Sequence, residues 1–211
     1  LDEYPWTAPD ELHHLVVARN LAVHNAYASG NPEKGFTYFD YYDSVGVSVL
    51  GPIALAFKAF SPTLVTARLV LATSYLLLCL GVWCFIRRYW DTTAALVSVL
   101  TITLTFGSVY LARSLYGEVP ALMSFLWSMV FWGKSFDSKR VRTLTAFAGV
   151  FWGLAVLAKT FMLLSAFPIT AVWLYDRITT KQIRWEQVIF PALGGGVVLG
   201  VWSGIEAHYA Y

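Results

Sequence analysis

Long apolar segments alternate with short polar loops along most of the chain, from about residue 63 onward. A helix that crosses a bilayer needs about 20 mostly apolar residues. We therefore predict an all-α polytopic membrane protein with about six transmembrane helices, and we expect the three shorter segments to extend or to bend. The six segments are roughly 63–86, 93–112, 118–133, 143–158, 161–175 and 187–207.

The N-terminal region has a different pattern, in which polar positions are interspersed with apolar ones. Thr7 and Pro9 suit the cap and the first turn of a helix, and the acidic residues that follow favour its positive end. We predict an amphipathic helix of about four turns that lies on the membrane surface. We expect it to end near residues 28–32 and to be followed by an aromatic, acidic loop at 36–42. Its apolar positions are Leu12, Leu15, Val16 and Ala22.

Residues 45–60 form one further apolar stretch. Lys58 and the Gly51-Pro52 pair interrupt it, so we interpret it as interfacial or partly re-entrant rather than as a full span. The chain then divides into a loop region with juxtamembrane helices, residues 1–62, and a transmembrane domain, residues 63–211.

Composition supports this assignment. Hydrophobic residues make up 57% of the chain and charged residues 13%, whereas soluble domains carry about 25% charged residues. The net charge of +2 is too small to indicate a nucleic-acid partner. Cys79 and Cys84 face different sides of one predicted helix, so we expect no disulfide between them. Residues 194–196 are three glycines inside an apolar segment, which favours close helix packing over phosphate binding.

The basic residues predict the orientation of the spans. One set of loops holds nine of them, and the opposite short loops hold only Arg113 and Lys159. By the positive-inside rule, the first set is cytoplasmic. Residues 1–62 then lie on the extracytoplasmic face, together with Glu118. The nine are Arg87, Arg88, Lys134, Lys139, Arg140, Arg142, Arg177, Lys181 and Arg184.

Ionisable residues at the outer ends of the predicted helices are the candidate site residues. Asp10 and Glu11 could include a general base, or they could be helix-start charges favoured by the dipole. Glu118 has the same two interpretations. Arg113 and Lys159 could hold a lipid phosphate, or they could be anchors that reach the headgroups.

Metal binding is a further hypothesis for the histidines. His13, His14, His24 and His208 could act with Asp43 or Glu118. The neighbouring His13 and His14 point about 100° apart on a helix, however, so they form a poor pair of ligands.

Four stretches together resemble the GT-C glycosyltransferases that use polyprenyl-phosphate sugars, in the branch of the bacterial lipid A aminoarabinose transferase and the protein O-mannosyltransferases. In the first stretch an acidic pair opens a juxtamembrane helix, and in the second another juxtamembrane element leads into a span with a basic end. In the third an acid opens the span that follows an outer loop, and in the fourth a Gly-Leu-Ala-x-Leu-x-Lys sequence ends a later span. In this order the stretches are Pro9–Leu21, Pro52–Arg88, Ala112–Leu122 and Gly153–Lys159.

The resemblance implies an inverting transferase that moves a sugar from a polyprenyl-phosphate donor to an acceptor hydroxyl outside the plasma membrane of a bacterium or archaeon. By position, Asp10 is implied as the base with Glu11 beside it, Glu118 as a supporting acid, and Lys159 as the phosphate ligand. Arg113 and Asp43 are further candidates for substrate binding, and at Asp43 the chain reads Asp43-Ser44-Val45-Gly46 where some members have Glu-Lys-Pro-Pro. The resemblance leaves open whether a divalent metal takes part.

The chain resembles the front half of a family member, so we expect more spans to follow. The acceptor could be a lipid, a glycan or a protein, and the bilayer is the immediate partner. The main alternative is a non-catalytic scaffold or accessory subunit of a larger membrane complex that keeps the GT-C-like fold. A transporter is less favoured, because its ionisable residues tend to lie in mid-membrane rather than at the outer boundary.

Overall fold

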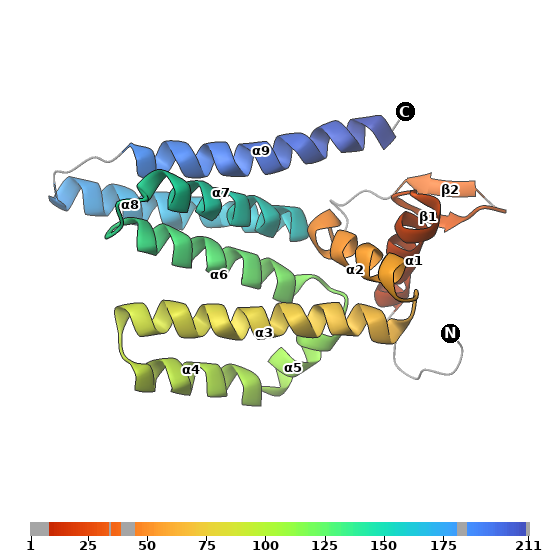
Figure 1. The fold of residues 1–211 in the computed structure, drawn as a ribbon, viewed down its shortest axis with the longest axis horizontal. Coiled ribbons are helices and arrows are strands. Elements are labelled where there is room, and N and C mark those ends of the chain that lie inside the picture. The colour runs from red at the N-terminus through yellow and green to blue at the C-terminus, as the bar shows by residue number, and fades with distance from the viewer. Residues whose placement is uncertain (1–8, 34, 39–44, 181–184, 210–211) are drawn as a thin grey trace.

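The computed structural model describes residues 9–33, 35–38, 45–180 and 185–209. Long helices run side by side along the molecule, and a smaller group of elements covers one end of them (Figure 1). The bundle contains α3 (Leu64–Tyr89), α4 (Thr92–Leu104), α5 (Phe106–Arg113), α6 (Glu118–Ser135), α7 (Val141–Ala158), the 3-10 helix η2 (Thr160–Ser165), α8 (Ala166–Thr180) and α9 (Glu186–Tyr209). The end group contains α1 (Pro9–His24), β1 (Ala28–Asn31), β2 (Gly35–Tyr38) and α2 (Val47–Ala59).

Each of the six predicted spans is helical, and the all-α polytopic membrane fold is confirmed. Within the described part of the chain, α3, α7 and α9 are long and apolar enough to cross a membrane. The predicted span 93–112 is instead two helices, α4 and α5, which bend by 66° at Thr105. Threonine hydroxyls in the last turns of α4 donate to carbonyls three or four residues earlier, which weakens and bends a helix.

The α7–α9 contact depends on residues without a side chain. A Cβ atom on Gly194 would lie 2.4 Å from the Ala146 carbonyl oxygen, and one on Gly149 would lie 2.0 Å from the Pro191 carbonyl oxygen. The predicted packing role is confirmed for Gly194 and Gly195, whereas Gly196 faces open space. Such close backbone approach is a common basis of helix association in membranes.

The end group shows three differences from the sequence predictions. The aromatic segment that we expected to be a loop contributes β2, which pairs antiparallel with β1. The Asn20 side-chain amide stabilises this hairpin, because it donates to the Ala28 carbonyl at 2.9 Å and to the Gly30 carbonyl at 3.0 Å. Of the predicted loop 36–42, residues 39–42 lie outside the described residues.

The second difference is the face of α1 that is buried. Leu12 is exposed and Val16 is only partly buried, whereas Glu11, His14 and Val17 are buried. This helix is therefore not a simple amphipathic surface helix, because polar side chains lie in its packed face and contact neighbouring elements.

The third difference is α2, which continues through Gly51-Pro52. Burial of apolar residues on both sides of the proline holds the helix together; they are Val49, Leu50, Ile53, Ala54 and Phe57.

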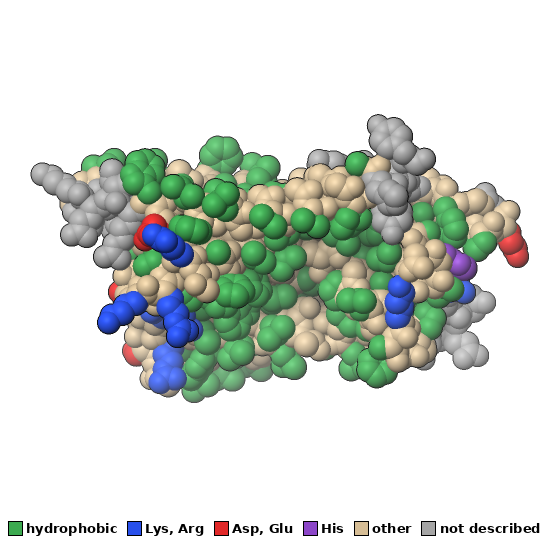
Figure 2. Space-filling view, turned by 45° about the horizontal axis from the view of Figure 1, so that its top comes forward, with side chains coloured by type: hydrophobic (Ala, Val, Ile, Leu, Met, Phe, Trp, Pro, Cys, Tyr) green, Lys and Arg blue, Asp and Glu red, His purple; other side chains and the backbone are tan. Residues whose placement is uncertain are grey.

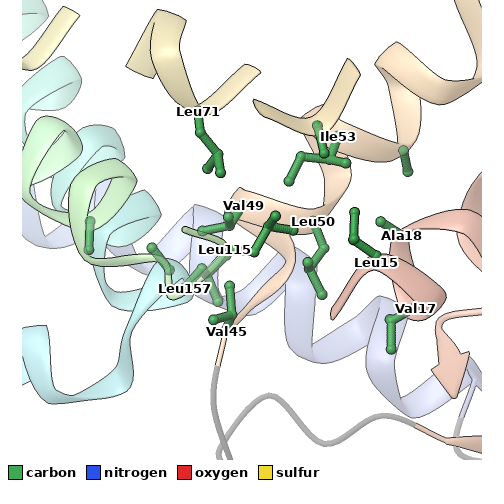
Figure 3. Packing of buried hydrophobic residues seen from close by; sticks show 14 of the residues in the cluster. Leu15, Val17, Ala18, Val45, Val49, Leu50, Ile53, Leu71, Leu115 and Leu157 are labelled. Carbon is green, nitrogen blue, oxygen red and sulfur yellow. The ribbon is translucent and has the colours of Figure 1, made fainter. Parts of the chain in front are cut away.

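An apolar core joins the end group to the bundle (Figure 3). It lies where α1, α2, α3 and α7 meet, and it includes Leu15, Leu50, Leu71, Leu115 and Leu157. Cys79 and Cys84 are both free, as predicted.

Charged groups gather at the ends of the molecule, with a wide apolar belt between them (Figure 2). The α3–α4 and α6–α7 connections, the end of α8 and the start of α9 lie at the end opposite to α1 and α2 (Figure 1). Most Lys and Arg side chains visible in Figure 2 are at that end. We call it the basic end.

The glycine contacts generate a prediction for stability. Gly194→Ala should lower the free energy of unfolding of the full-length protein by about 1–3 kcal/mol, and with it the melting temperature, because the new Cβ would press on the α7 backbone. Gly196→Ala, on the same helix but in open space, should be neutral or slightly stabilising. Melting in detergent measures both, and equal melting temperatures would contradict the packing role of Gly194.

Candidate active site

The candidate site begins with the seating of α1 on the loop between α5 and α6. The His14 Nδ1 atom lies 2.8 Å from the carbonyl oxygen of Leu115. A carbonyl can only accept a hydrogen bond, so Nδ1 carries a proton, and in the neutral imidazole Nε2 is then the acceptor nitrogen. His14 is 1% exposed. Burial lowers its pKa to about 4, although the Leu115 carbonyl acts in the opposite direction.

Glu11 is fixed by the same loop and by α3. Its side chain is buried, and its Oε1 atom lies 3.9 Å from a terminal nitrogen of Arg68. Burial raises the pKa of Glu11, and this effect exceeds the opposing effects of the Arg68 charge and of the Leu115 backbone hydrogen bond. The Leu115 backbone therefore contacts α1 twice, once at the His14 side chain and once at the Glu11 side chain.

Glu118 and Lys159 form an ion pair beside this contact. Glu118 begins α6 and Lys159 follows the last residue of α7, and their Oε1 and Nζ atoms are 3.3 Å apart. The residue before Glu118, Gly117, has φ of +82°, which glycine adopts without strain. A Cβ at Gly117 would lie 3.4 Å from Lys159 Cε, so the loop and the lysine stem are in contact.

Asp10 lies at the exposed start of α1, on the same side. The charges of Asp10 and Lys159 both act on the pKa of His14, so both groups lie within electrostatic range of the His14 imidazole. Asp10 and Glu11 also contribute to raising the pKa of Tyr116, for which a hydrogen bond with Tyr110 is the first cause. Carboxylates and a cation that are far apart in sequence thus converge at one end of the bundle.

Several polar atoms in this region are buried and form no hydrogen bond with any residue that the structure describes. They come from four different elements. Most buried polar groups in proteins are paired, and leaving one unpaired costs about 1–3 kcal/mol. Such a cluster at one place is typical of a site whose ligand supplies the partners. The atoms are Glu11 Oε1, Arg68 Nε, Glu118 Oε2 and Thr160 Oγ1.

Two other predicted site residues are not part of this cluster. The Arg113 side chain is exposed at the end of α5, and it forms no ion pair with any described residue. Asp43 lies outside the described residues. Among the residues that the structure describes, no three His, Cys, Asp or Glu side chains gather as a metal site would need.

Sequence reasoning missed the importance of Arg68 and treated His14 only as a metal ligand. Arg68 is an ionisable residue in the second turn of a predicted span, which is itself a signal of function. His14 gave no comparable signal, because its burial depends on the α5–α6 loop, which is 101 residues away in the chain.

Comparison with known proteins gives one match. The model of the family described as dolichyl-phosphate-mannose-protein mannosyltransferase matches residues 52–204, which is well over half of the chain. No curated protein and no solved structure matches the chain significantly. The matched segment includes Arg68, Glu118 and Lys159, whereas Asp10 and Glu11 precede it.

The lowered pKa of His14 predicts how stability depends on pH. Between pH 6.5 and about 4 the unfolded chain binds a proton at this position that the folded chain does not. The stabilising effect of neutral His14 is therefore fully present above pH 6.5 and is lost as the pH falls toward 4.

His14→Gln keeps a donor for the Leu115 carbonyl but does not titrate. Its melting temperature should fall less than that of the wild type between pH 6.5 and pH 4, measured on the full-length protein. The raised pKa of Glu11 has the opposite effect on stability as the pH falls, but it is present in both the wild type and the variant. His24→Gln, at an exposed position near the end of α1, is the control. An unchanged pH dependence in His14→Gln would contradict the assignment.

Proposed function

The chain belongs to the dolichyl-phosphate-mannose-protein mannosyltransferase family, and we propose that it transfers a sugar from a polyprenyl-phosphate donor to an acceptor hydroxyl with inversion. It is an integral membrane protein of the GT-C type, and the family implies a lipid-linked sugar donor. The observation that carries the proposal is the convergence of Asp10, Glu118 and Lys159 at one end of the bundle, beside buried polar atoms that form no hydrogen bond within the described part of the chain.

Lys159 is the proposed ligand of the donor phosphate. Its side chain is 17% exposed, and its only ion-pair partner among the described residues is Glu118. The Glu118 carboxylate holds the ammonium in place between α6 and α7. A phosphate that enters from the lipid would gain a charge-assisted hydrogen bond in a region with little water, where such bonds are strong.

Asp10 is the proposed general base. It is exposed, so an acceptor from the aqueous side can reach it. In the proposed step the acceptor oxygen attacks the anomeric carbon, and the bond from that carbon to the phosphate oxygen breaks. The polyprenyl phosphate leaves with the electron pair, and the acceptor proton goes to the Asp10 carboxylate. Attack on the face opposite to the phosphate inverts the anomeric centre.

A groove along α1, whose lining begins at Leu12, two residues after Asp10, offers a place for the acceptor. It has a volume of about 780 Å³ and lies between the outer face of α1 and the β1–β2 turn. Its walls carry both charged and amide side chains, including Arg19, Asn20 and Glu33. This polar character suits a lipid headgroup, a glycan or a peptide better than an acyl chain.

The orientation of the protein is part of the proposal. The basic end carries loops that the positive-inside rule assigns to the cytoplasm. The candidate active site is at the other end (Figure 1). We therefore assign the reaction to the extracytoplasmic face of a bacterial or archaeal plasma membrane.

Asp10→Asn should lower turnover about 10²–10⁴-fold, because general base catalysis typically contributes that much. The assay uses full-length protein, a polyprenyl-phosphate sugar and an acceptor, and donor binding should change little. Asp137→Asn, the same change at an exposed acid of the basic end, is the matched control and should keep wild-type turnover. Wild-type turnover in Asp10→Asn would refute the assignment of Asp10 as the base.

Lys159→Met should raise the KM for the donor about 10–100-fold, because a hydrogen bond to a charged group contributes about 1.5–3 kcal/mol. Lys159→Arg keeps the charge and should recover part of this loss. Lys58→Met removes a lysine at an exposed position of α2 and should leave KM unchanged. A Lys159→Met enzyme with altered kcat and normal donor KM would argue against phosphate binding.

A further inference from the structure

A second cavity lies within the bundle, away from the candidate active site. It has a volume of about 230 Å³ and is bounded by α6, α7, α8 and α9. Its residues on α6 lie in the last turns of that helix, and those on α9 lie in the first turns. Both segments adjoin the loops of the basic end (Figure 1). Apolar groups and three indole rings, from Trp132, Trp152 and Trp173, form most of the wall.

The cavity contains polar atoms that form no hydrogen bond with the described residues. Gln187 is 2% exposed, and neither its Oε1 nor its Nε2 atom has a hydrogen-bond partner in that part of the chain. Trp173 is 8% exposed, and its Nε1 atom also lacks an acceptor. The other two indoles differ, because Trp132 donates to the Gln187 carbonyl and Trp152 donates to the Ser165 hydroxyl. Water is scarce at membrane depth, so these orphaned groups call for a ligand with its own polar atoms.

The cavity opens sideways between α8 and α9. Thr170 on α8 and Val188 and Ala192 on α9 all line it and are all exposed. A molecule dissolved in the bilayer can therefore enter from the lipid without passing through the polar ends of the protein.

Positive charge lies close to this opening. Arg142, at the start of α7, pairs with Glu186 at 2.9 Å, and its guanidinium lies 5.9 Å from the Phe190 ring centroid. Glu186 directly precedes Gln187. The α6–α7 connection adds Lys139 and Arg140, whose side chains are exposed. Basic pockets between transmembrane helices on this side of a membrane are typical binding sites of anionic lipid headgroups.

We propose that this cavity binds an anionic phospholipid with a hydroxylated headgroup, of the phosphatidylglycerol type, from the leaflet at the basic end. An ester carbonyl accepts hydrogen bonds from Gln187 Nε2 and Trp173 Nε1, and a headgroup hydroxyl donates to Gln187 Oε1. The phosphate lies toward Arg142, and an acyl chain follows the apolar wall. A polyprenyl chain is excluded from the same role because it has no polar atom to pair with the amide.

The test measures lipid retention by the full-length protein. The protein is equilibrated in nanodiscs of mixed phosphatidylglycerol and phosphatidylcholine, and co-purifying lipid is counted by native mass spectrometry. The wild type should retain phosphatidylglycerol in preference to phosphatidylcholine. Gln187→Leu keeps the side-chain size but removes the amide, so it should reduce this preference about fivefold or more. Thr101→Val, a loss of a polar group at an exposed position of α4, is the control and should retain the preference.

Trp173→Phe provides a second variant that keeps an aromatic ring and removes only the indole N–H. It should also reduce retention, even if Gln187→Leu fails to fold. Three results would overturn the proposal: no preference in the wild type, an unchanged preference in both variants, or displacement of the phospholipid by added polyprenyl phosphate. None of these results bears on the role of Asp10, so the two proposals fail independently.

Discussion

The arrangement of the candidate site depends on the hydrogen bonds between the Leu115 backbone and α1. Its side chain is fully buried in the core that joins α1, α2, α3 and α7. Its carbonyl contacts His14, and its backbone also hydrogen-bonds to Glu11. Because the same loop leads into α6, the position of α1 relative to Glu118 is set by one short segment. The low pKa of His14 keeps this contact in one protonation state at neutral pH, since a neutral imidazole is what the buried environment requires.

The end of α7 is the second fixed point, and backbone contacts hold it. The Gly46 N–H donates to the Ala158 carbonyl at 3.2 Å, directly before Lys159. A Cβ on Gly46 would lie 1.7 Å from the Leu157 carbonyl oxygen, so no larger residue fits there without movement of the backbone. The Ser48 hydroxyl donates to Leu154 at 2.8 Å and adds a third link. These contacts connect the start of α2 to the end of α7, and they place the lysine beside the α5–α6 loop.

The sequence predicted the bundle well because long apolar segments and basic loops are local signals. It also placed Asp10, Glu118 and Lys159 on one side, since the number of spans between them decides that. The bend at Thr105 and the β1–β2 hairpin were missed, because each depends on side-chain hydrogen bonds that hydropathy does not encode. The burial of Glu11 and His14 was missed for a related reason: their partners, Arg68 and Leu115, are distant in the chain. Tertiary contacts, rather than the periodicity of α1, determine which of its faces is buried.

The different surroundings of Asp10 and Glu11 give these neighbouring carboxylates different proposed roles. Two adjacent positions on a helix point about 100° apart, so one can face the protein while the other faces solvent. Glu11 faces inward, where Arg68 and the Leu115 backbone constrain it and burial raises its pKa. A group in that setting can position α1 but cannot readily meet an acceptor that arrives from water. Asp10 is exposed and remains within electrostatic range of His14, on which Lys159 also acts. A general base must reach the acceptor. The exposed Asp10 meets this requirement and the buried Glu11 does not, so the base is assigned to Asp10.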